Sequence, residues 1–390
     1  MAPPIETAEN APSKHISFDR FLRYFLWLGI FGFGGPIATV GYMQRDLIEK
    51  RGWLEHEDFL NGVALGQVMP GPLAAQVAML VGFLARGAIG ALAVAGAFIL
   101  PSFVLVLTVA VLYVRFQGLA VVQALFYGIA PAVMAIIALA AVKLARLTDQ
   151  HDPRLWGISA ITLVVTAVTG AEIALVFIAA GLVMVVWDAP PDMLRRSSPR
   201  AALLPLGVPT LSFAAIHAGT QGALFLFFLK AGAFIFGSGL AIVPFPREGV
   251  VTQHHWLTQH QFLDAVAMGL ITPGPVVITA AFIGYLVGGF LGAIVATVAI
   301  FIPIYLGVVI PGRWFVRHSK DPRVQAFVKG ATAAAAGAIG GATIILTRGA
   351  VVDVKTAVIA LISLGLLRRL KLKEPILVVL AGVAGILLHG

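Results

Sequence analysis

The chain has 390 residues, of which 59% are hydrophobic and 12% are charged, with a formal net charge of +9 and no cysteine. A charged fraction this far below the roughly 25% of soluble domains excludes an ordinary soluble protein. The lack of cysteine excludes disulfides, thiolate metal sites and cysteine nucleophiles. The cations lie at the ends of apolar runs, where they set membrane topology. We therefore expect a lipid bilayer around the chain and no nucleic-acid partner.

Apolar runs, each close to the roughly 20 residues that cross a bilayer, follow a polar tail at residues 1–17. In the first half they cover residues 20–43, 60–84, 87–114, 121–143, 155–170 and 172–188. In the second half they cover residues 223–246, 261–286, 290–311, 324–347, 351–368 and 374–389. The predicted organisation is a cytoplasmic tail (1–17), a first transporter repeat (18–188), a linker with an inverting span (189–223) and a second transporter repeat (224–390). No evident cleavage site follows the first run, so we expect a retained span.

The two halves are tandem copies of one sequence. The triplet Pro70-Gly71-Pro72 recurs as Pro273-Gly274-Pro275, 203 residues later. After one deletion the offset becomes 202, and Pro101 and Gly128 match Pro303 and Gly330. Paired membrane halves with interrupted hydrophobic segments at corresponding positions are typical of secondary transporters, whose substrate sites lie at the breaks.

The charges in the loops decide between parallel and inverted halves. The halves are inverted only if the weaker apolar run at residues 201–218 crosses the membrane. With this crossing and the N-terminus inside, twenty Lys and Arg lie in the cytoplasm and six lie outside, namely Arg45, Lys50, Arg51, Arg115, Arg348 and Lys355. Without it the count is twelve against fourteen, which is no bias. The sequence therefore predicts an all-α polytopic membrane protein with about 13 transmembrane helices, inverted halves and an external C-terminus.

Several motifs carry a family resemblance. The string FGFGGP at residues 31–36, the loop Arg51-Gly52-Trp53-Leu54 and the first Pro-Gly-Pro triplet have counterparts in the same order in the second half. The matching residues there are Phe234, Phe236 and Gly237, then Trp256-Leu257, then Pro273-Gly274-Pro275. In this respect the chain resembles the chromate transporter family in its long, two-half form. The resemblance implies a protein of the bacterial inner membrane that exports chromate, with sulfate as the similar oxyanion. From the residues themselves we expect no cofactor. The second copy departs from the first where Gly35-Pro36 becomes Ser238-Gly239.

The triplets are the predicted substrate site. A proline inside a helix removes a hydrogen bond at a cost of about 3 kcal/mol or more, and in hydrocarbon the freed groups need protein or a water-filled cavity. Pro72 and Pro275 suit the first residue of a new half-helix, whose free amides and positive dipole end suit an oxyanion. The alternative is a plain kink. The candidate substrate-binding residues are Gly34, Gly35, Gln67, Pro70, Gly71, Pro72, Gln76, Lys230, Gly237, Ser238, Thr272, Pro273, Gly274, Pro275 and Thr279.

Some of these candidates have a second interpretation. Gly34, Gly35 and Gly237 suit close helix packing as well as a ligand, and the glutamines and threonines suit ordinary bonds between helices. Lys230 lies within a span, where a charge costs roughly 2.5 to 3.5 kcal/mol and usually marks a pathway. Its alternative is a long side chain that reaches the membrane surface.

The acids and histidines favour a transporter over an enzyme. For Glu172, Glu374 and Asp264 we expect helix capping or surface positions rather than proton transfer. His254, His255 and His260 lack the spacing of a helical metal pair, so no metal site is expected. The sequence has no acid-base constellation and no phosphate-binding loop. Two classes of protein then remain: a carrier, which could form a homodimer, and an anion channel. Because few acids lie deep in a span, the sequence favours export driven by the membrane potential.

Overall fold

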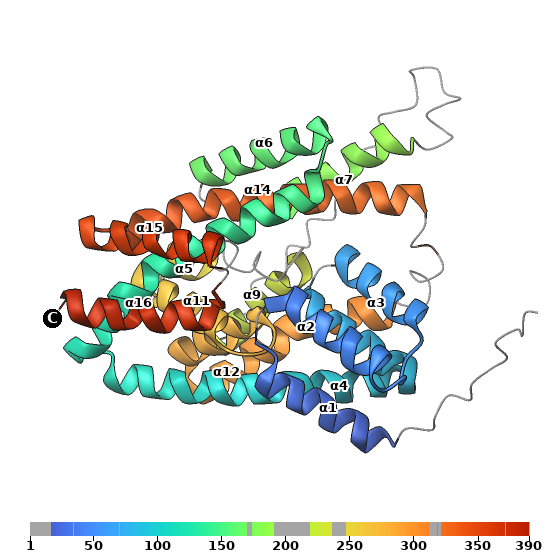
Figure 1. The fold of residues 1–390 in the computed structure, drawn as a ribbon, viewed down its shortest axis with the longest axis horizontal. Coiled ribbons are helices and arrows are strands. Elements are labelled where there is room, and N and C mark those ends of the chain that lie inside the picture. The colour runs from blue at the N-terminus through green and yellow to red at the C-terminus, as the bar shows by residue number, and fades with distance from the viewer. Residues whose placement is uncertain are drawn as a thin grey trace, which may run out of the picture.

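The computed structural model describes residues 17–33, 35–69, 71–169, 174–190, 219–235, 247–311, 318, 321–370 and 372–389. Within these ranges the secondary structure is helical, without strands, which confirms the all-α fold (Figure 1). Among the described residues, four helices are long and apolar enough to cross a membrane: Leu73–Phe116 (α4), Ala120–Asp149 (α5), Val276–Val309 (η4 with α12) and Pro322–Ala350 (α14). Gly34, Pro70, Glu172, Gly237, Ser238 and the run at 201–218 lie outside the described residues.

Helix α4 consists of two helical segments that fold back on each other. The turn lies at Arg86 and Gly87, where Gly87 has a φ of 61°. Gly82 faces the carbonyl of Gly90, so closely that a Cβ on Gly82 would lie 2.5 Å from that oxygen. Eight residues span about 12 Å in a straight helix, so segments 73–85 and 88–116 run in opposite directions. The second half repeats this turn at Gly289, which has a φ of 63°.

The Pro-Gly-Pro triplets make the chain reverse once more. Gly62 of α3 (His56–Val68) faces Leu80, and Gly66 faces Leu73 across the first triplet. In the second half, Gly269 of α11 (Gln259–Ile271) packs against Thr279, the first residue of α12 (Thr279–Val309). The predicted breaks are therefore present, and each triplet forms the tip of a helical hairpin.

The N-terminal run reverses as well, at the FGFGGP string. Tyr24 of α1 (Phe18–Phe31) donates a hydrogen bond to the carbonyl of Tyr42 in α2 (Gly35–Met43), at 3.4 Å. The Phe21 ring lies 6.2 Å from that of Trp53, beyond the π-helix η1 (Gln44–Glu49). The structure thus corrects the expectation that the runs 20–43, 60–84 and 261–286 each cross once. Each of them enters and leaves the bundle at the same end.

The two halves have opposite orientations. Arg86, at the base of the first hairpin, lies 4.6 Å above the Phe18 ring, and segment 88–116 leads from there to the other end of the bundle. There Tyr113 donates a 2.7 Å hydrogen bond to Asp264, near the base of the second hairpin. Tyr305 of α12 donates to the carbonyl of Ala88 at 3.0 Å, so the crossing segments are antiparallel. We name the two ends the Phe18 end and the His389 end, at the right and left of Figure 1.

Because of the hairpins, four cations lie at the end of the bundle opposite to the one that the sequence predicted. Arg45, Lys50 and Arg51 line one cavity with Arg20 and Arg23 and so lie at the Phe18 end, not at the opposite one. At the His389 end lie Arg115, Arg348, Lys355 and Arg247, whose Nε donates to Gln259 at 3.2 Å. The described Phe18 end holds fourteen cations, namely Arg20, Arg23, Arg45, Lys50, Arg51, Arg86, Lys143, Arg146, Arg154, Arg323, Lys329, Arg368, Arg369 and Lys373. Among the described cations, fourteen therefore lie at the Phe18 end and four at the His389 end, an asymmetry of the same sign as the sequence predicted.

The halves interleave rather than lie side by side. In the first half α5 packs against α16 (Glu374–His389) of the second, and α14 packs against α6 (Pro153–Thr169) and α7 (Ala174–Asp188) of the first. Gly128 meets the carbonyl of Ala381, and its repeat partner Gly330 meets that of Ala180. Glycine allows this approach of two backbones because it has no Cβ. The last crossing before α16 is α15 (Val354–Arg369).

Candidate functional site

The two triplets pack reciprocally against the opposite halves. Gly71 has a φ of 142°, and a Cβ there would lie 3.1 Å from Cγ2 of Ile304 in the second half. Gly274 has a φ of 94°, and a Cβ there would overlap Oγ of Ser102 in the first half. Ser102 and Ile304 are repeat partners at the offset of 202. Each hairpin tip thus rests on the same position of the other half's crossing segment.

The first tip is held by hydrogen bonds to two main-chain carbonyls. The Gly71 amide donates to the carbonyl of Ile235, at 2.5 Å, just after the end of α9 (Thr220–Phe234). Gln76 is fully buried, and its Nε2 donates to the Met69 carbonyl at 3.2 Å. Pro72 is the N-cap of α4, so the new helix begins at Leu73, one residue after the expected position. The positive end of α4 therefore lies at the triplet.

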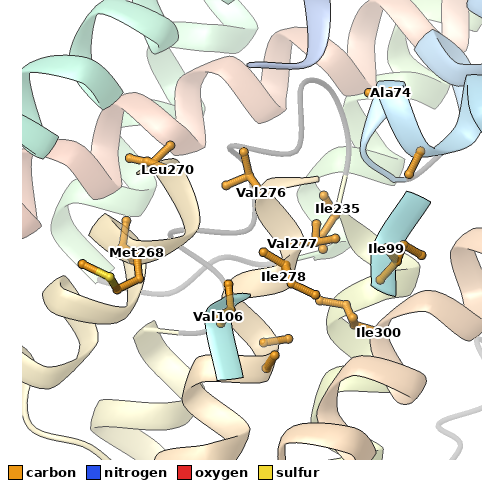
Figure 2. Packing of buried hydrophobic residues seen from close by; sticks show 14 of the residues in the cluster. Ala74, Ile99, Val106, Ile235, Met268, Leu270, Val276, Val277, Ile278 and Ile300 are labelled. Atoms are coloured by element: carbon orange, nitrogen blue, oxygen red, sulfur yellow. The ribbon is translucent and has the colours of Figure 1, made fainter. Parts of the chain in front are cut away.

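At the second tip, a proline again caps the helical segment that follows the triplet. Pro275 is the N-cap of the 3₁₀ turn η4 (Val276–Ile278), which leads into α12. The hydroxyls of Thr272 and Thr279 donate to the carbonyls of Gly269, at 3.3 Å, and Val276, at 2.8 Å. Both threonines thus stabilise the hairpin, and their donors are occupied. Figure 2 shows the η4 side chains among apolar residues of both halves, with labels on Ala74, Ile99, Val106, Ile235, Met268, Leu270, Val276, Val277, Ile278 and Ile300.

Ser102 is a residue that sequence reasoning missed. Its side chain is fully buried, and its Oγ has no hydrogen-bond partner among the described residues. A buried hydroxyl without a partner is costly unless a ligand or water supplies one. Its repeat partner is the apolar Ile304. The signal that could have identified this position is a polar residue beside the repeated proline Pro101.

Lys230 lies in α9, five residues before Ile235, whose carbonyl accepts the Gly71 amide. It is exposed on α9, whose buried side chains are Leu224, Phe228 and Ala231. Within the described ranges no carboxylate pairs with it. Gly35 begins α2, and Gln67 lies in the last turn of α3, with the position of its side chain outside the description. The structure thus gathers Gly71, Pro72, Gln76 and the second triplet at hairpin tips, whereas the Lys230 side chain is exposed.

A basic cavity opens at the Phe18 end. It has a volume of about 440 Å³ and is lined by Arg20, Arg23, Tyr24, Trp27, Arg45, Asp46, Lys50 and Arg51. Asp46 pairs with Arg45 at 3.1 Å and with Lys50 at 3.5 Å. Arg51 stacks over the Trp53 ring at 4.6 Å. Five cations against one acid in this basic vestibule give a field that attracts anions.

Comparison with known proteins identifies the family. The chromate transporter family matches residues 20–185 and 222–386, that is, one copy in each half. The chain belongs to the chromate transporter family. It is 47% identical over 393 residues to the chromate transport protein of Cupriavidus metallidurans, covering 99% of this chain and 98% of that protein. It is 46% identical over 378 residues to a probable chromate transport protein of Synechococcus elongatus, covering 95% of each. No solved structure matches.

For this chromate transporter family member, the His389 end holds a polar cavity of about 420 Å³. Its polar lining comes from Tyr113, Gln117, Gln123, Tyr127, His260, Asp264 and His389. We call it the polar vestibule. Asp264 is 8% exposed and lies six residues after Thr258, the N-cap of α11. The expectation of a capping or surface role for Asp264 is therefore wrong, because the reversal at the second triplet buries this face of α11.

Glu374, His254, His255 and His260 also lie within the described ranges, whereas Glu172 does not. Glu374 is in the first turn of α16. The His254 ring stacks on Trp256, with centroids 4.2 Å apart, in the turn before α11. In the part of the chain that the structure describes, no three histidine or acidic side chains form a metal-binding group.

Proposed function

We propose that this protein is a secondary carrier that exports chromate across the bacterial inner membrane and confers chromate resistance. The reciprocal packing of the two triplets on Ser102 and Ile304 carries the proposal. In this arrangement, a movement of one half changes the surroundings of both tips at once, as alternating access requires. The names of the relatives supply the substrate, and sulfate, with the same shape and charge, is the competing anion.

The charge distribution supports the direction. Fourteen of the described cations lie at the Phe18 end, and the positive-inside rule assigns that end to the cytoplasm. The basic vestibule then faces the cytoplasm, where it raises the local concentration of a dianion before transport. The C-terminus lies at the opposite, periplasmic end.

The chemistry of the tips suits a tetrahedral oxyanion. At Pro72 and Pro275 the positive ends of α4 and of η4 with α12 face the two turns. The Ser102 hydroxyl adds a donor that no described residue uses. In a site shielded from water, such fixed dipoles replace the hydration of the anion without a permanent charge that would trap it. Gly71, Pro72, Gln76, Gly274, Pro275 and Ser102 form the core of the proposed site.

The membrane potential supplies enough driving force. A dianion that leaves a cell with 100 mV, negative inside, gains about 4.6 kcal/mol, at roughly 2.3 kcal/mol per charge. At about 1.4 kcal/mol per tenfold, this sustains roughly a thousandfold gradient.

The deciding experiment uses the purified protein in liposomes loaded with chromate. A potential that is negative on the side of the basic vestibule should accelerate chromate exit, and the rate should saturate with substrate. A rate that rises linearly, at channel-like turnover, would contradict a carrier. Cells that express the protein should also grow at higher chromate concentrations than cells with the empty vector.

A further inference from the structure

Asp264 joins the second hairpin to the opposite half. It lies on α11, about 10 Å before the end of that helix at 1.5 Å per residue, and α11 leads directly into the second triplet. Its only described hydrogen bond comes from the Tyr113 hydroxyl, which lies on the crossing segment of the first half, at 2.7 Å. Tyr113 is also only 8% exposed. A carboxyl group therefore lies inside the interface that must change when the halves move.

No cation balances this carboxyl group in the part of the chain that the structure describes. The titratable groups around it are Tyr113 on α4, Tyr127 on α5, His260 on α11 and His389 on α16. Asp353 lies beyond them, where it accepts a hydrogen bond from Tyr127. Helix α14 contributes Gly349 and Ala350 to the lining, with the exposed Arg348 before them, and Arg247 of the neighbouring turn is bonded to Gln259.

The surroundings of Asp264 favour an exchangeable proton. Burial disfavours the ionised form of a carboxyl group, whereas the hydroxyl of Tyr113 stabilises it as a hydrogen-bond donor. The polar vestibule connects the site to the His389 end through His260, Gln117 and Gln123. A group that is buried, weakly compensated and in contact with a polar cavity is suited to gain and lose a proton during a transport cycle.

Only one half carries this pair. At the offset of 203, Asp264 corresponds to Asn61, and at the offset of 202, Tyr113 corresponds to Phe315. The repeat partners thus have neither the acid nor the hydroxyl. Both halves have a Pro-Gly-Pro tip and a glycine turn. Asp264 has no counterpart in the first half, so this acid is an asymmetric feature of the His389 end.

We propose that Asp264, positioned by Tyr113, is a proton-binding site whose occupancy is linked to anion binding at the hairpin tips. The inference rests on the proposed function and adds a second ligand to it. The sign follows from charge. A dianion at the tips repels an ionised Asp264, so anion binding promotes proton uptake there, and by reciprocity a proton on Asp264 strengthens anion binding. On uptake, the proton passes from water in the polar vestibule to a carboxylate oxygen of Asp264. On release, it passes from this oxygen back to that water.

The first test measures protons on binding. Chromate or sulfate is added to the purified protein in weakly buffered detergent solution with a pH indicator dye. Wild type should take up protons as the anion binds, and its affinity should fall as the pH rises. Asp264→Asn, which copies Asn61 of the other half, should bind the anion with no proton uptake and with an affinity independent of pH. Uptake that persists in Asp264→Asn, or proton release in wild type, would overturn the proposal.

The second test needs no anion and therefore separates this inference from the proposed function. Infrared difference spectra between alkaline and acidic pH should contain a carboxylic acid C=O band that disappears in Asp264→Asn and shifts in Tyr113→Phe. The matched control is Asp353→Asn, which removes the acid of the exposed Tyr127 pair but keeps a good N-cap. It should retain the band. If Asp264→Asn retains it as well, Asp264 carries no exchangeable proton, whatever the protein transports.

Discussion

Ser102 and Gly274 are in direct contact, although they lie 172 positions apart in the sequence and belong to different halves. Ser102 is fully buried beside the tip of the second hairpin, and Gly274 leaves no room for a Cβ between them. Because the repeat partner of Ser102 is Ile304, the first tip meets an isoleucine at the position where the second tip meets a hydroxyl. The two tips are therefore alike in backbone and different in chemistry.

Gly274→Ala should reduce chromate transport by roughly tenfold or more. The added methyl group would overlap Ser102 Oγ and force alanine into a φ of 94°, and strain of this kind costs about 1–3 kcal/mol, at about 1.4 kcal/mol per tenfold. Gly71→Ala should act likewise. Initial rates in liposomes, at equal protein amounts, measure the effect. Gly307→Ala on α12, where no atom lies within 4 Å of the new Cβ, is the control. Transport by Gly274→Ala at the rate of this control would exclude the tip from the pathway.

Ser102→Ala should weaken anion binding without loss of stability. Its Oγ has no hydrogen-bond partner among the described residues, so removal costs no internal bond, whereas a bond to a charged ligand contributes roughly 1.5–3 kcal/mol. We expect an increase in KM for chromate of about tenfold or more, at about 1.4 kcal/mol per tenfold, and an unchanged thermal unfolding midpoint. An unchanged KM would show that the hydroxyl faces water or the protein instead of the substrate.

Arg51→Gln combined with Arg20→Gln should raise KM and weaken its dependence on salt. Both side chains line the basic vestibule, and attraction of an anion by surface cations is screened over about 10 Å at 0.1 M salt. The maximal rate should change little, because these cations lie away from the tips. Arg348→Gln, an exposed cation at the His389 end, is the matched variant. Equal effects of the two changes would contradict an approach of the substrate through the basic vestibule.

Single cysteines should map the two ends without interference, since the chain has no cysteine of its own. Glu55→Cys and His151→Cys should react with an impermeant thiol reagent from the cytoplasmic side, and Val352→Cys, at a position 61% exposed, from the periplasmic side. Glu55 distinguishes a hairpin from a single crossing of the first run, because a single crossing would place Glu55 on the same side of the membrane as Val352. Labelling of Glu55→Cys from outside the cell would exclude the hairpin at FGFGGP.

Lys230→Gln separates the two interpretations of the lysine. Because the side chain is exposed on α9, whereas Ser102 is buried against the second tip, we expect Lys230→Gln to change KM for chromate less than Ser102→Ala does. A larger effect would mean that α9 turns this face toward the pathway in another state of the carrier. Lys230→Arg, which keeps the charge, tests whether that effect depends on charge.

The sequence by itself determined the membrane class, the duplication, the breaks at the triplets and the excess of cations at one end. These features depend on composition, on residue identity at a fixed offset and on proline chemistry, all of which are local. It also predicted the inversion of the halves, through a count of charges. The predicted inversion holds although the count placed Arg45, Lys50, Arg51 and Arg247 at the wrong end. A hairpin changes the position of one loop and leaves the direction of the later crossings unchanged.

Only the tertiary structure decided which way the chain turns at each break and what meets there. A kink and a reversal need the same prolines and glycines, and the difference lies in the packing of Gly66 on Leu73 and of Gly82 on Gly90. The same reversals bury Asp264, which hydropathy places near a surface, and bring Tyr113 to it from the other half. Contacts between Ser102 and Gly274, or between Gly128 and Ala381, depend on how the halves interleave, and no local pattern in the sequence records that.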